Sequence, residues 1–326
     1  MLPALIGFST LGLQSYAIGP FVPHHFDVSL TQACSSFTYS GQPFSLALAA
    51  VNADGVTTAN YDGSGNTSPN YAKAVTLSLQ GAGASTGALN STSVPLTSFA
   101  AGIATYASTG VSPFKFTFTA KLTAATAVSV RATESASSIS SSGWDGTLTA
   151  RSGRIKVSNA FGSEKSTLDI PVQAQYWNGK TWVVNSDDSC TYIPVASVVR
   201  TNYLDYKGGA TSSWTTTPVT KVTVSSVPMA VVIGSGNGTL TLGAPSPAST
   251  GSVDFAFNLG TTSTDQSCLA SHTASTAANV DWLRALNGSA NSCAGLTSYD
   301  RDPSARVTFG VYKPESKKAV FIRDMY

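Results

Sequence analysis

The chain is poor in charged residues. Only 11% of its 326 residues are Asp, Glu, Lys or Arg, against roughly 25% in an average soluble domain. The 19 basic and 17 acidic residues nearly balance, so the sequence offers no strongly basic surface of the kind that binds nucleic acid. Ser, Thr, Gly, Ala and Asn take the place of the charges. This composition favours a protein exposed outside the cell over a helical cytosolic enzyme.

The sequence also lacks a run of about 20 apolar residues that could cross a bilayer as a helix. We therefore expect no membrane span. The apolar start, residues 1–20, carries no basic residues of a secretory leader, and Pro3 and Gly7 interrupt it. We expect an extended arm there, which adds a strand either to its own sheet or to a neighbour's.

Histidine is scarce, and the three residues are His24, His25 and His272. No serine near them lies in a Gly-x-Ser-x-Gly frame. Neighbouring side chains of a strand point to opposite faces, so His24 and His25 are not expected to bind one metal ion together. The sequence therefore predicts no catalytic residues, no cofactor and no enzyme activity.

Cysteine is limited to four residues, and no two of them form a Cys-x-x-Cys pair. An even number without that spacing favours disulfides in an oxidising compartment over a zinc site. Four cysteines allow three pairings. The local pair Cys268–Cys293 is the favoured one, with Cys34–Cys190 as its complement. These pairs predict an extracellular or cell-surface location.

Strict alternation of apolar and polar residues is what the chain has in abundance. Its clearest examples are the stretch 168–176 and the three phenylalanines Phe114, Phe116 and Phe118. Period two is the pattern of half-buried strands, and strands every 8–12 residues with turn signals between them predict β-sandwiches. The Ser-rich stretch 134–146 has no period and marks the best boundary between domains.

The predicted fold is therefore all-β, with two immunoglobulin-like antiparallel β-sandwich domains in tandem. We expect an N-terminal extended arm at residues 1–20, a first sandwich at residues 21–142 and a second at residues 143–326.

A hairpin in the second half carries the first candidate site. Asn178-Gly179 predicts a two-residue type I′ turn that pairs Tyr176 with Thr181. In this register Trp177 and Trp182 lie on one face of the sheet. Because aromatic rings stack on the apolar faces of sugars, these two residues are the candidates for a glycan-binding face, although tryptophan more often packs against its own protein.

Clustered carboxylates form a second, weaker candidate. Asp187 and Asp188 lie in one predicted loop, and Asp300 and Asp302 in another. Loop carboxylates can supply the six to eight oxygens that calcium takes. The spacing is not that of an EF-hand, and Arg301 competes for its acidic neighbours. We expect no metal, with calcium at these four residues as the alternative.

Several stretches together resemble one family. They are FVPHHFDVSL, ACSSFTYSGQPFSL and AVNADGVTTANYDG near the start, GRIKVSNAFGSEKSTLDIPVQAQYWNGKTWVVNSDDSCT in the centre, and DPSARVTFGVYK with FIRDMY at the end. They are similar to the C-terminal domain of MshQ-like biogenesis proteins of MSHA-type type IV pili. The resemblance covers about residues 21–326, although the region 265–299 departs from the pattern.

The resemblance implies a bacterial surface or pilus setting and brings neither catalytic residues nor a cofactor. We therefore expect a non-enzymatic, extracellular structural or adhesive module. Its partners would be other surface or pilus proteins, or copies of itself. Two alternatives stay open. One is a carbohydrate-binding module that uses Trp177 and Trp182, and the other is a self-assembling filament subunit in which residues 1–20 add a strand to the next subunit.

Overall fold

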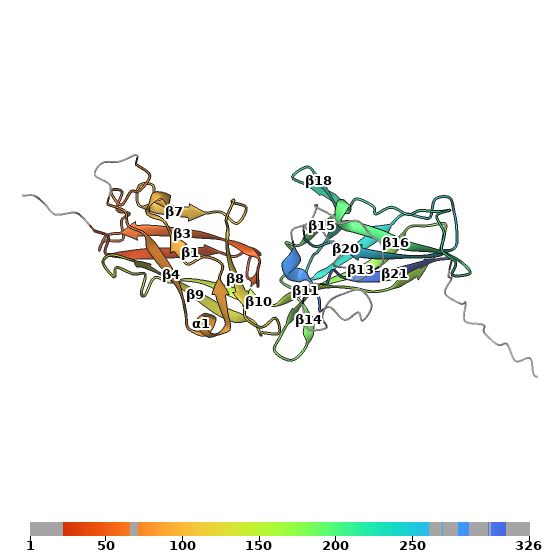
Figure 1. The fold of residues 1–326 in the computed structure, drawn as a ribbon, viewed down its shortest axis with the longest axis horizontal. Helices are drawn as coiled ribbons and strands as arrows, with labels where there is room; N and C mark the ends of the chain where they lie inside the picture. Colours follow the sequence, from red (N-terminus) through yellow and green to blue (C-terminus); the bar gives the residue numbers. More distant parts are fainter. Residues whose placement is uncertain are drawn as a thin grey trace, which may run out of the picture.

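The computed structural model describes residues 22–65, 71–260, 269, 280–286, 299 and 301–310. Strands dominate this part of the chain, and the prediction of an all-β sandwich fold is confirmed. The strands form two bodies that lie end to end (Figure 1). The predicted arm, residues 1–20, lies outside the described residues.

The first sandwich consists of two five-stranded sheets. One has the order β1-β3-β8-β5 with β7 also paired to β3, and the other has the order β2-β10-β9-β4-β6. Their bounds are β1 His25–Thr31, β2 Thr38–Tyr39, β3 Pro43–Val51, β4 Val75–Gln80, β5 Gly87–Leu89, β6 Ser93–Val94, β7 Ile103–Tyr106, β8 Phe114–Phe118, β9 Thr126–Glu134 and β10 Gly146–Arg151. A short helix α1 (Ala82–Thr86) and a 3-10 turn η1 (Leu96–Ser98) connect strands.

The second sandwich consists of three smaller sheets. Their orders are β11-β13-β14 with β19 also paired to β13, then β12-β21-β20-β16, and β15-β18-β17. Their bounds are β11 Gly153–Val157, β12 Ala160–Gly162, β13 Leu168–Trp177, β14 Trp182–Val184, β15 Tyr192–Pro194, β16 Val198–Asp205, β17 Val222–Val224, β18 Val227–Val232, β19 Asn237–Leu242, β20 Gly251–Phe257 and β21 Ser304–Phe309. Two 3-10 turns, η2 (Val195–Ser197) and η3 (Asp281–Leu283), complete it.

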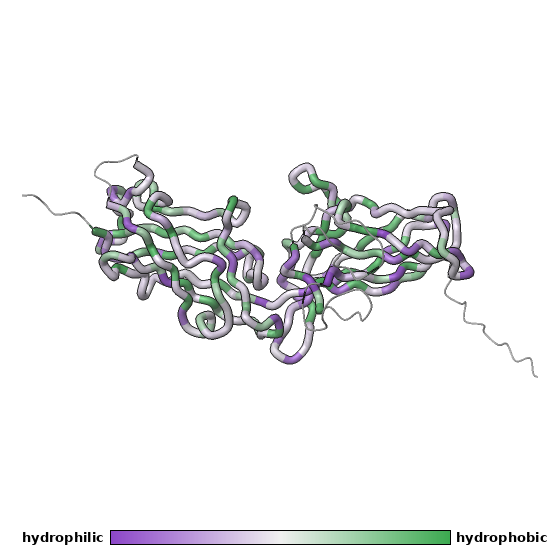
Figure 2. The backbone as a smooth tube through the Cα atoms, viewed as in Figure 1, coloured by the Kyte–Doolittle hydropathy of each residue, from purple (hydrophilic) through white to green (hydrophobic). Residues whose placement is uncertain are grey.

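Alternation in the sequence becomes alternation in burial. Phe114, Phe116 and Phe118 of β8 are buried, and the residues between them are more exposed. In β13 the residues Leu168 and Ile170 are buried while Asp169 is exposed. Figure 2 shows hydrophobic residues recurring along the strands of both sandwiches. Two separate clusters of buried side chains result, one inside each sandwich.

Two pairings depart from the antiparallel expectation. β2 runs parallel to β10, and β12 runs parallel to β21. In both cases a two- or three-residue strand joins the edge of a sheet after a long excursion of the chain. Such short edge strands carry little periodic signal, because two or three residues do not define a period.

The predicted register of the hairpin is wrong by two residues. Trp177 pairs with Trp182, and Tyr176 pairs with Val183 rather than Thr181. The loop is longer than a two-residue turn because the side-chain oxygen of Asn178 accepts hydrogen bonds from the backbone N–H groups of Lys180 and Thr181. A shift of two residues keeps every side chain on its face, so Trp177 and Trp182 still share one.

The first core extends beyond residue 142, where the sequence suggested a boundary. Leu148 and Ala150 of β10 are buried in the first core, and β10 pairs with β9 along five residues. The Ser-rich stretch before β10 is anchored, since the N–H of Ser141 donates to the carbonyl of Ala132. By packing, the first sandwich ends at Arg151, and Gly153 begins the first strand of the second.

Within the described ranges, none of the helices is both long enough and apolar enough to span a bilayer.

Candidate functional site at the junction of the two sandwiches

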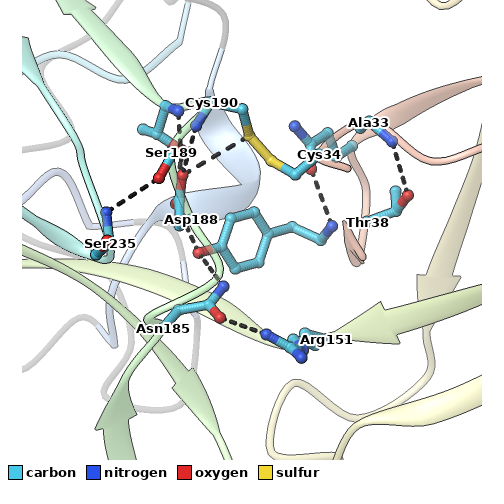
Figure 3. Close-up of a disulfide and its surroundings, with 12 residues drawn as sticks. Ala33, Cys34, Thr38, Arg151, Asn185, Asp188, Ser189, Cys190 and Ser235 are labelled. Carbon is cyan, nitrogen blue, oxygen red and sulfur yellow. Dashed lines mark hydrogen bonds between the residues drawn. A yellow bond between two sulfur atoms is a disulfide. The ribbon is translucent and has the colours of Figure 1, made fainter. Parts of the chain in front are cut away.

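A disulfide between Cys34 and Cys190 joins the two sandwiches (Figure 3). The Cα atoms of the two residues are 5.7 Å apart, and 156 residues separate them in sequence. Cys34 follows β1 of the first sandwich, and Cys190 precedes β15 of the second. This confirms one of the two predicted pairs. The other pair, Cys268 and Cys293, lies outside the described residues.

The segment around Cys34 crosses from one sandwich to the other. By sequence it connects β1 to β3, but Cys34, Phe37 and Tyr39 are buried in the hydrophobic core of the second sandwich. Cys34 and Phe37 exchange two backbone hydrogen bonds of 3.0 Å, and the rings of Phe37 and Tyr39 meet edge to face with centroids 4.8 Å apart. The first sandwich therefore inserts a compact turn into the second.

Asp188 is the buried charge around which this junction is organised. Its Oδ2 accepts hydrogen bonds from the hydroxyls of Tyr39 and Thr191, each 2.8 Å long. Its Oδ1 accepts from the backbone N–H groups of Cys190 and Thr191 at 3.1 Å. Because a buried carboxylate is costly unless it is hydrogen-bonded, these donors make its burial tolerable.

Tyr39 has a second partner across the junction. The side-chain N–H of Asn185 donates to the Tyr39 hydroxyl oxygen at 2.7 Å, so the hydroxyl accepts one bond while it donates another to Asp188. Burial, reinforced by the nearby negative charge of Asp188, raises the pKa of Tyr39 well above its usual value. The neutral phenol is thereby held in the state that donates to Asp188.

Arg151, the last residue of β10, lies between two aromatic rings. Its guanidinium carbon is 4.7 Å from the centroid of Phe37 and 4.7 Å from that of Tyr176. It also donates hydrogen bonds to Asn185 and, at 2.7 Å, to Asp187. Tyr176, Asn185 and Asp187 belong to the second sandwich, so one arginine of the first contacts three residues across the boundary.

The calcium candidates are held by protein donors. Asp188 is saturated as described above, and the exposed Asp187 forms an ion pair with Arg151. Asp302 is buried, and it accepts from the Nε of Arg284 at 2.9 Å and from the backbone N–H of Leu259 at 3.1 Å. Asp300 lies outside the described residues. Asp187, Asp188 and Asp302 thus act as anchors for neighbouring loops.

Cys34, Asp188 and Cys190 form one compact group of metal-ligating side chains, with ligand atoms within 4.8 Å of one another. Thiolates, and not disulfide sulfurs, are the ligands that bind metals well. Because the two sulfurs are bonded to each other, the group functions here as a covalent link between the sandwiches.

The glycan-face candidates lie beside the junction as one aromatic pair. The ring centroids of Trp177 and Trp182 are 5.7 Å apart at an interplanar angle of 67°. The guanidinium of Arg154 lies 4.4 Å from the Trp182 ring, and it donates to the Gln175 side-chain oxygen. Burial lowers the pKa of Arg154. One face of Trp182 is therefore already occupied by this arginine.

A cavity of about 550 Å³ opens where β8 of the first sandwich approaches η3 of the second. Its lining includes Lys121, Asp281, Trp282 and Tyr299. The ammonium group of Lys121 donates to the Trp282 carbonyl at 2.7 Å, and burial lowers its pKa to about 8. Sequence reasoning missed this place, because its lining comes from several segments far apart in the chain that share no motif.

Together these features define a class: an all-β protein of two sandwiches, joined by a disulfide and a buried polar network. Residues 6–133 match the third domain of the DUF6701 family, and residues 151–325 match its fourth domain. The chain belongs to this uncharacterised family. No curated protein matches the chain. The gap between the two matches, residues 134–150, contains β10 except for its last residue, Arg151.

Proposed function

We propose that the chain is a stiff, non-enzymatic structural module of an extracellular or bacterial surface protein. The observation that carries the proposal is the Cys34–Cys190 disulfide between the two sandwiches. The insertion of Phe37 and Tyr39 into the second core supports it, as do the hydrogen bonds from Tyr39 to Asp188 and from Arg151 to Asp187. A covalent bond plus polar contacts, of which Tyr39–Asp188 is buried, restrict rotation between domains more than a peptide linker does.

The disulfide also supports the proposed location, since disulfides persist in oxidising compartments. The similarity of residues 21–326 to MshQ-like proteins of MSHA pili adds a surface or pilus setting as the finer proposal. Other surface or pilus proteins, or copies of this chain, are the proposed partners. On intact cells of the source organism, we expect protease treatment to remove the protein. Complete protection of the protein, with lysis exposing it, would contradict the surface location.

Stiffness is tested by small-angle X-ray scattering on the whole chain. We expect the oxidised protein to scatter as one elongated particle of fixed shape. The Cys34→Ser/Cys190→Ser variant should show a broader distribution of interdomain distances, with both sandwiches still folded by circular dichroism. The Cys268→Ser/Cys293→Ser variant is the matched control for removing two cysteines. Equal flexibility of the wild type and the Cys34→Ser/Cys190→Ser variant would refute the proposal.

Glycan binding is the second proposed function, because Trp177 and Trp182 share a face beside the junction. We expect binding on a glycan array to disappear in Trp177→Ala. Trp144→Ala, an exposed tryptophan of the first sandwich, is the matched control. No binding by the wild-type protein to any glycan would remove this function.

Assembly through residues 1–20 is a third proposal, and light scattering of a chain that lacks residues 1–18 tests it.

A further inference from the structure

Two adjacent histidines at the start of β1 bring their rings together. The Nδ1 atoms of His24 and His25 are 3.0 Å apart, and the ring planes are nearly perpendicular. The sequence predicted that the two imidazoles point to opposite faces, and this is wrong. His24 lies in a bend before β1, which begins at His25, so the alternation of a strand does not apply to it.

The neighbouring carboxylate determines which nitrogen of His25 is free. Nε2 of His25 lies 3.2 Å from Oδ1 of Asp27, and among the described residues this buried oxygen accepts no hydrogen bond. The carboxylate therefore favours a proton on Nε2. In a neutral imidazole that leaves a lone pair on Nδ1, directed at the ring of His24.

A tryptophan holds the His25 ring in place. The rings of His25 and Trp144 are stacked, with centroids 3.7 Å apart and planes 24° from parallel. The backbone carbonyl of Trp144 accepts a hydrogen bond from the N–H of Val28 in β1, which ties the two segments together. His25 is buried and rigidly placed, whereas His24 is exposed to solvent. A metal ion can reach the pair from outside.

We propose that His24 and His25 bind one divalent copper ion through their two Nδ1 atoms. With metal–nitrogen bonds of about 2.1 Å, a separation of 3.0 Å corresponds to an angle of about 90° at the metal. That angle fits the tetragonal geometry of Cu²⁺ or Ni²⁺ better than the tetrahedral geometry of Zn²⁺, and copper binds more tightly than nickel.

Asp27 then serves as the outer partner of the site. Ligating histidines commonly donate their second N–H to a carboxylate, which orients the ring and raises the basicity of the ligand nitrogen. In the metal-free protein, one Nδ1–H donates to the other Nδ1. Copper takes the place of that proton, which moves to Nε2 of the same neutral imidazole, so binding releases no net proton, and water completes the coordination.

The test is a titration of the untagged full chain with CuCl₂, with glycine as a weak competitor and tryptophan fluorescence as the readout. We expect one copper ion per chain and quenching of Trp144, one of five tryptophans. Trp144→Phe should abolish most of the quenching but leave binding unchanged by calorimetry. His24→Ala, at an exposed position, should weaken binding at least tenfold without affecting the fold.

Matched variants separate this site from nonspecific binding. Asp27→Asn should weaken binding by about 10-fold to 100-fold, as expected for an outer-sphere carboxylate. Asp54→Asn removes an exposed carboxylate elsewhere, and His272→Ala removes the third histidine of the chain; neither should change the affinity. Binding that survives His24→Ala at full strength, quenching that survives Trp144→Phe, or tighter binding of Zn²⁺ than of Cu²⁺ would each overturn the proposal.

Discussion

The hydroxyl of Tyr39, in the first half of the chain, donates a 2.8 Å hydrogen bond to the buried carboxylate of Asp188, in the second half. The same hydroxyl accepts from Asn185, and the disulfide Cys34–Cys190 lies close by (Figure 3). One covalent bond and several buried polar bonds thus act on the same few residues. Because Tyr39 also packs in the second core, separating the two sandwiches would expose both a ring and a charge.

Asp188→Asn should destabilise the protein strongly. The substitution keeps the size of the side chain but replaces one carboxylate oxygen by an NH₂ group, which cannot accept hydrogen bonds from Tyr39, Thr191 or the backbone. Hydrogen bonds to charged groups contribute about 1.5–3 kcal/mol each, so we expect the free energy of unfolding to fall by about 3 kcal/mol. Urea denaturation followed by circular dichroism measures it.

Asp187→Asn is the matched control for Asp188→Asn. Asp187 is exposed and pairs with Arg151 at the surface, where an ion pair contributes about 0–1 kcal/mol. We expect this variant to unfold within about 1 kcal/mol of the wild type. An equal decrease in the free energy of unfolding in both variants would show that Asp188 is not the organising charge of the junction.

The Tyr39→Phe variant should lose less stability than the wild type as the pH rises above about 10. The pKa of Tyr39 is raised in the folded state, while in the unfolded chain a tyrosine ionises near pH 10. Above about pH 10 the unfolded state therefore binds fewer protons than the folded state, and stability falls as the pH rises. Below pH 10 the neutral phenol contributes fully to the stability of the folded state. Melting temperatures between pH 8 and pH 12 measure the slope, which is the change of melting temperature with pH.

The slope should not vanish in Tyr39→Phe, because a second tyrosine behaves similarly. Burial also raises the pKa of Tyr61, whose hydroxyl donates to Glu134 in the first sandwich at 2.9 Å. We expect Tyr61→Phe to flatten the slope as well, and Tyr206→Phe, at an exposed position, to serve as the reference. An unchanged slope in Tyr39→Phe would contradict the burial of its hydroxyl.

Arg151→Lys should weaken the junction although it conserves the charge. A planar guanidinium stacks on aromatic rings and donates in two directions, whereas an ammonium is a compact point charge. We expect a loss of about 1–2 kcal/mol, since both Phe37 and Tyr176 lose a cation–π partner. Arg131→Lys is the control, because Arg131 forms an ion pair with Asp145 within the first sandwich. Thermal unfolding compares the two, and similar small shifts would count against a role for Arg151.

Sequence patterns predicted the strands well because each strand carries its own period. The phenylalanines of β8 and the alternation of β13 identify a buried face without reference to any partner. Pairing partners are a different matter. The register of Trp177 with Trp182 depended on how the Asn178 side chain folds the loop, and the two-residue β2 has no period to detect.

The junction was harder to predict because its residues are far apart in sequence. Asp188 stood out only as one of several loop carboxylates, and nothing around it indicates burial or a tyrosine partner 149 residues away. Counting cysteines did offer Cys34–Cys190, as the complement of Cys268–Cys293 in one of the three possible connectivities. The sequence carries no comparable signal that Phe37 and Tyr39 pack into the second core. Apolar residues in a turn of the first sandwich could equally well pack into the core of the first sandwich.

Gly153→Ala should disturb the junction through a steric effect. A Cβ atom at this position of β11 would overlap the ring of Tyr39 and lie 2.7 Å from a methyl carbon of Leu283. Both neighbours are buried, so we expect a loss of about 1–3 kcal/mol, as for other overpacked cores. At Gly234 a Cβ would meet no atom within 4 Å, so Gly234→Ala is the neutral control.

A double-mutant cycle shows whether the cost of Gly153→Ala arises at Tyr39. Tyr39→Ala alone removes the ring and its bond to Asp188, and it leaves space next to Gly153. If the clash with the ring is the cause, Gly153→Ala should cost much less in the Tyr39→Ala background than in the wild type, because contacting residues are not additive. Urea denaturation of the four proteins gives the coupling free energy. Strict additivity would place the effect of Gly153 elsewhere in β11 and remove Tyr39 from the explanation.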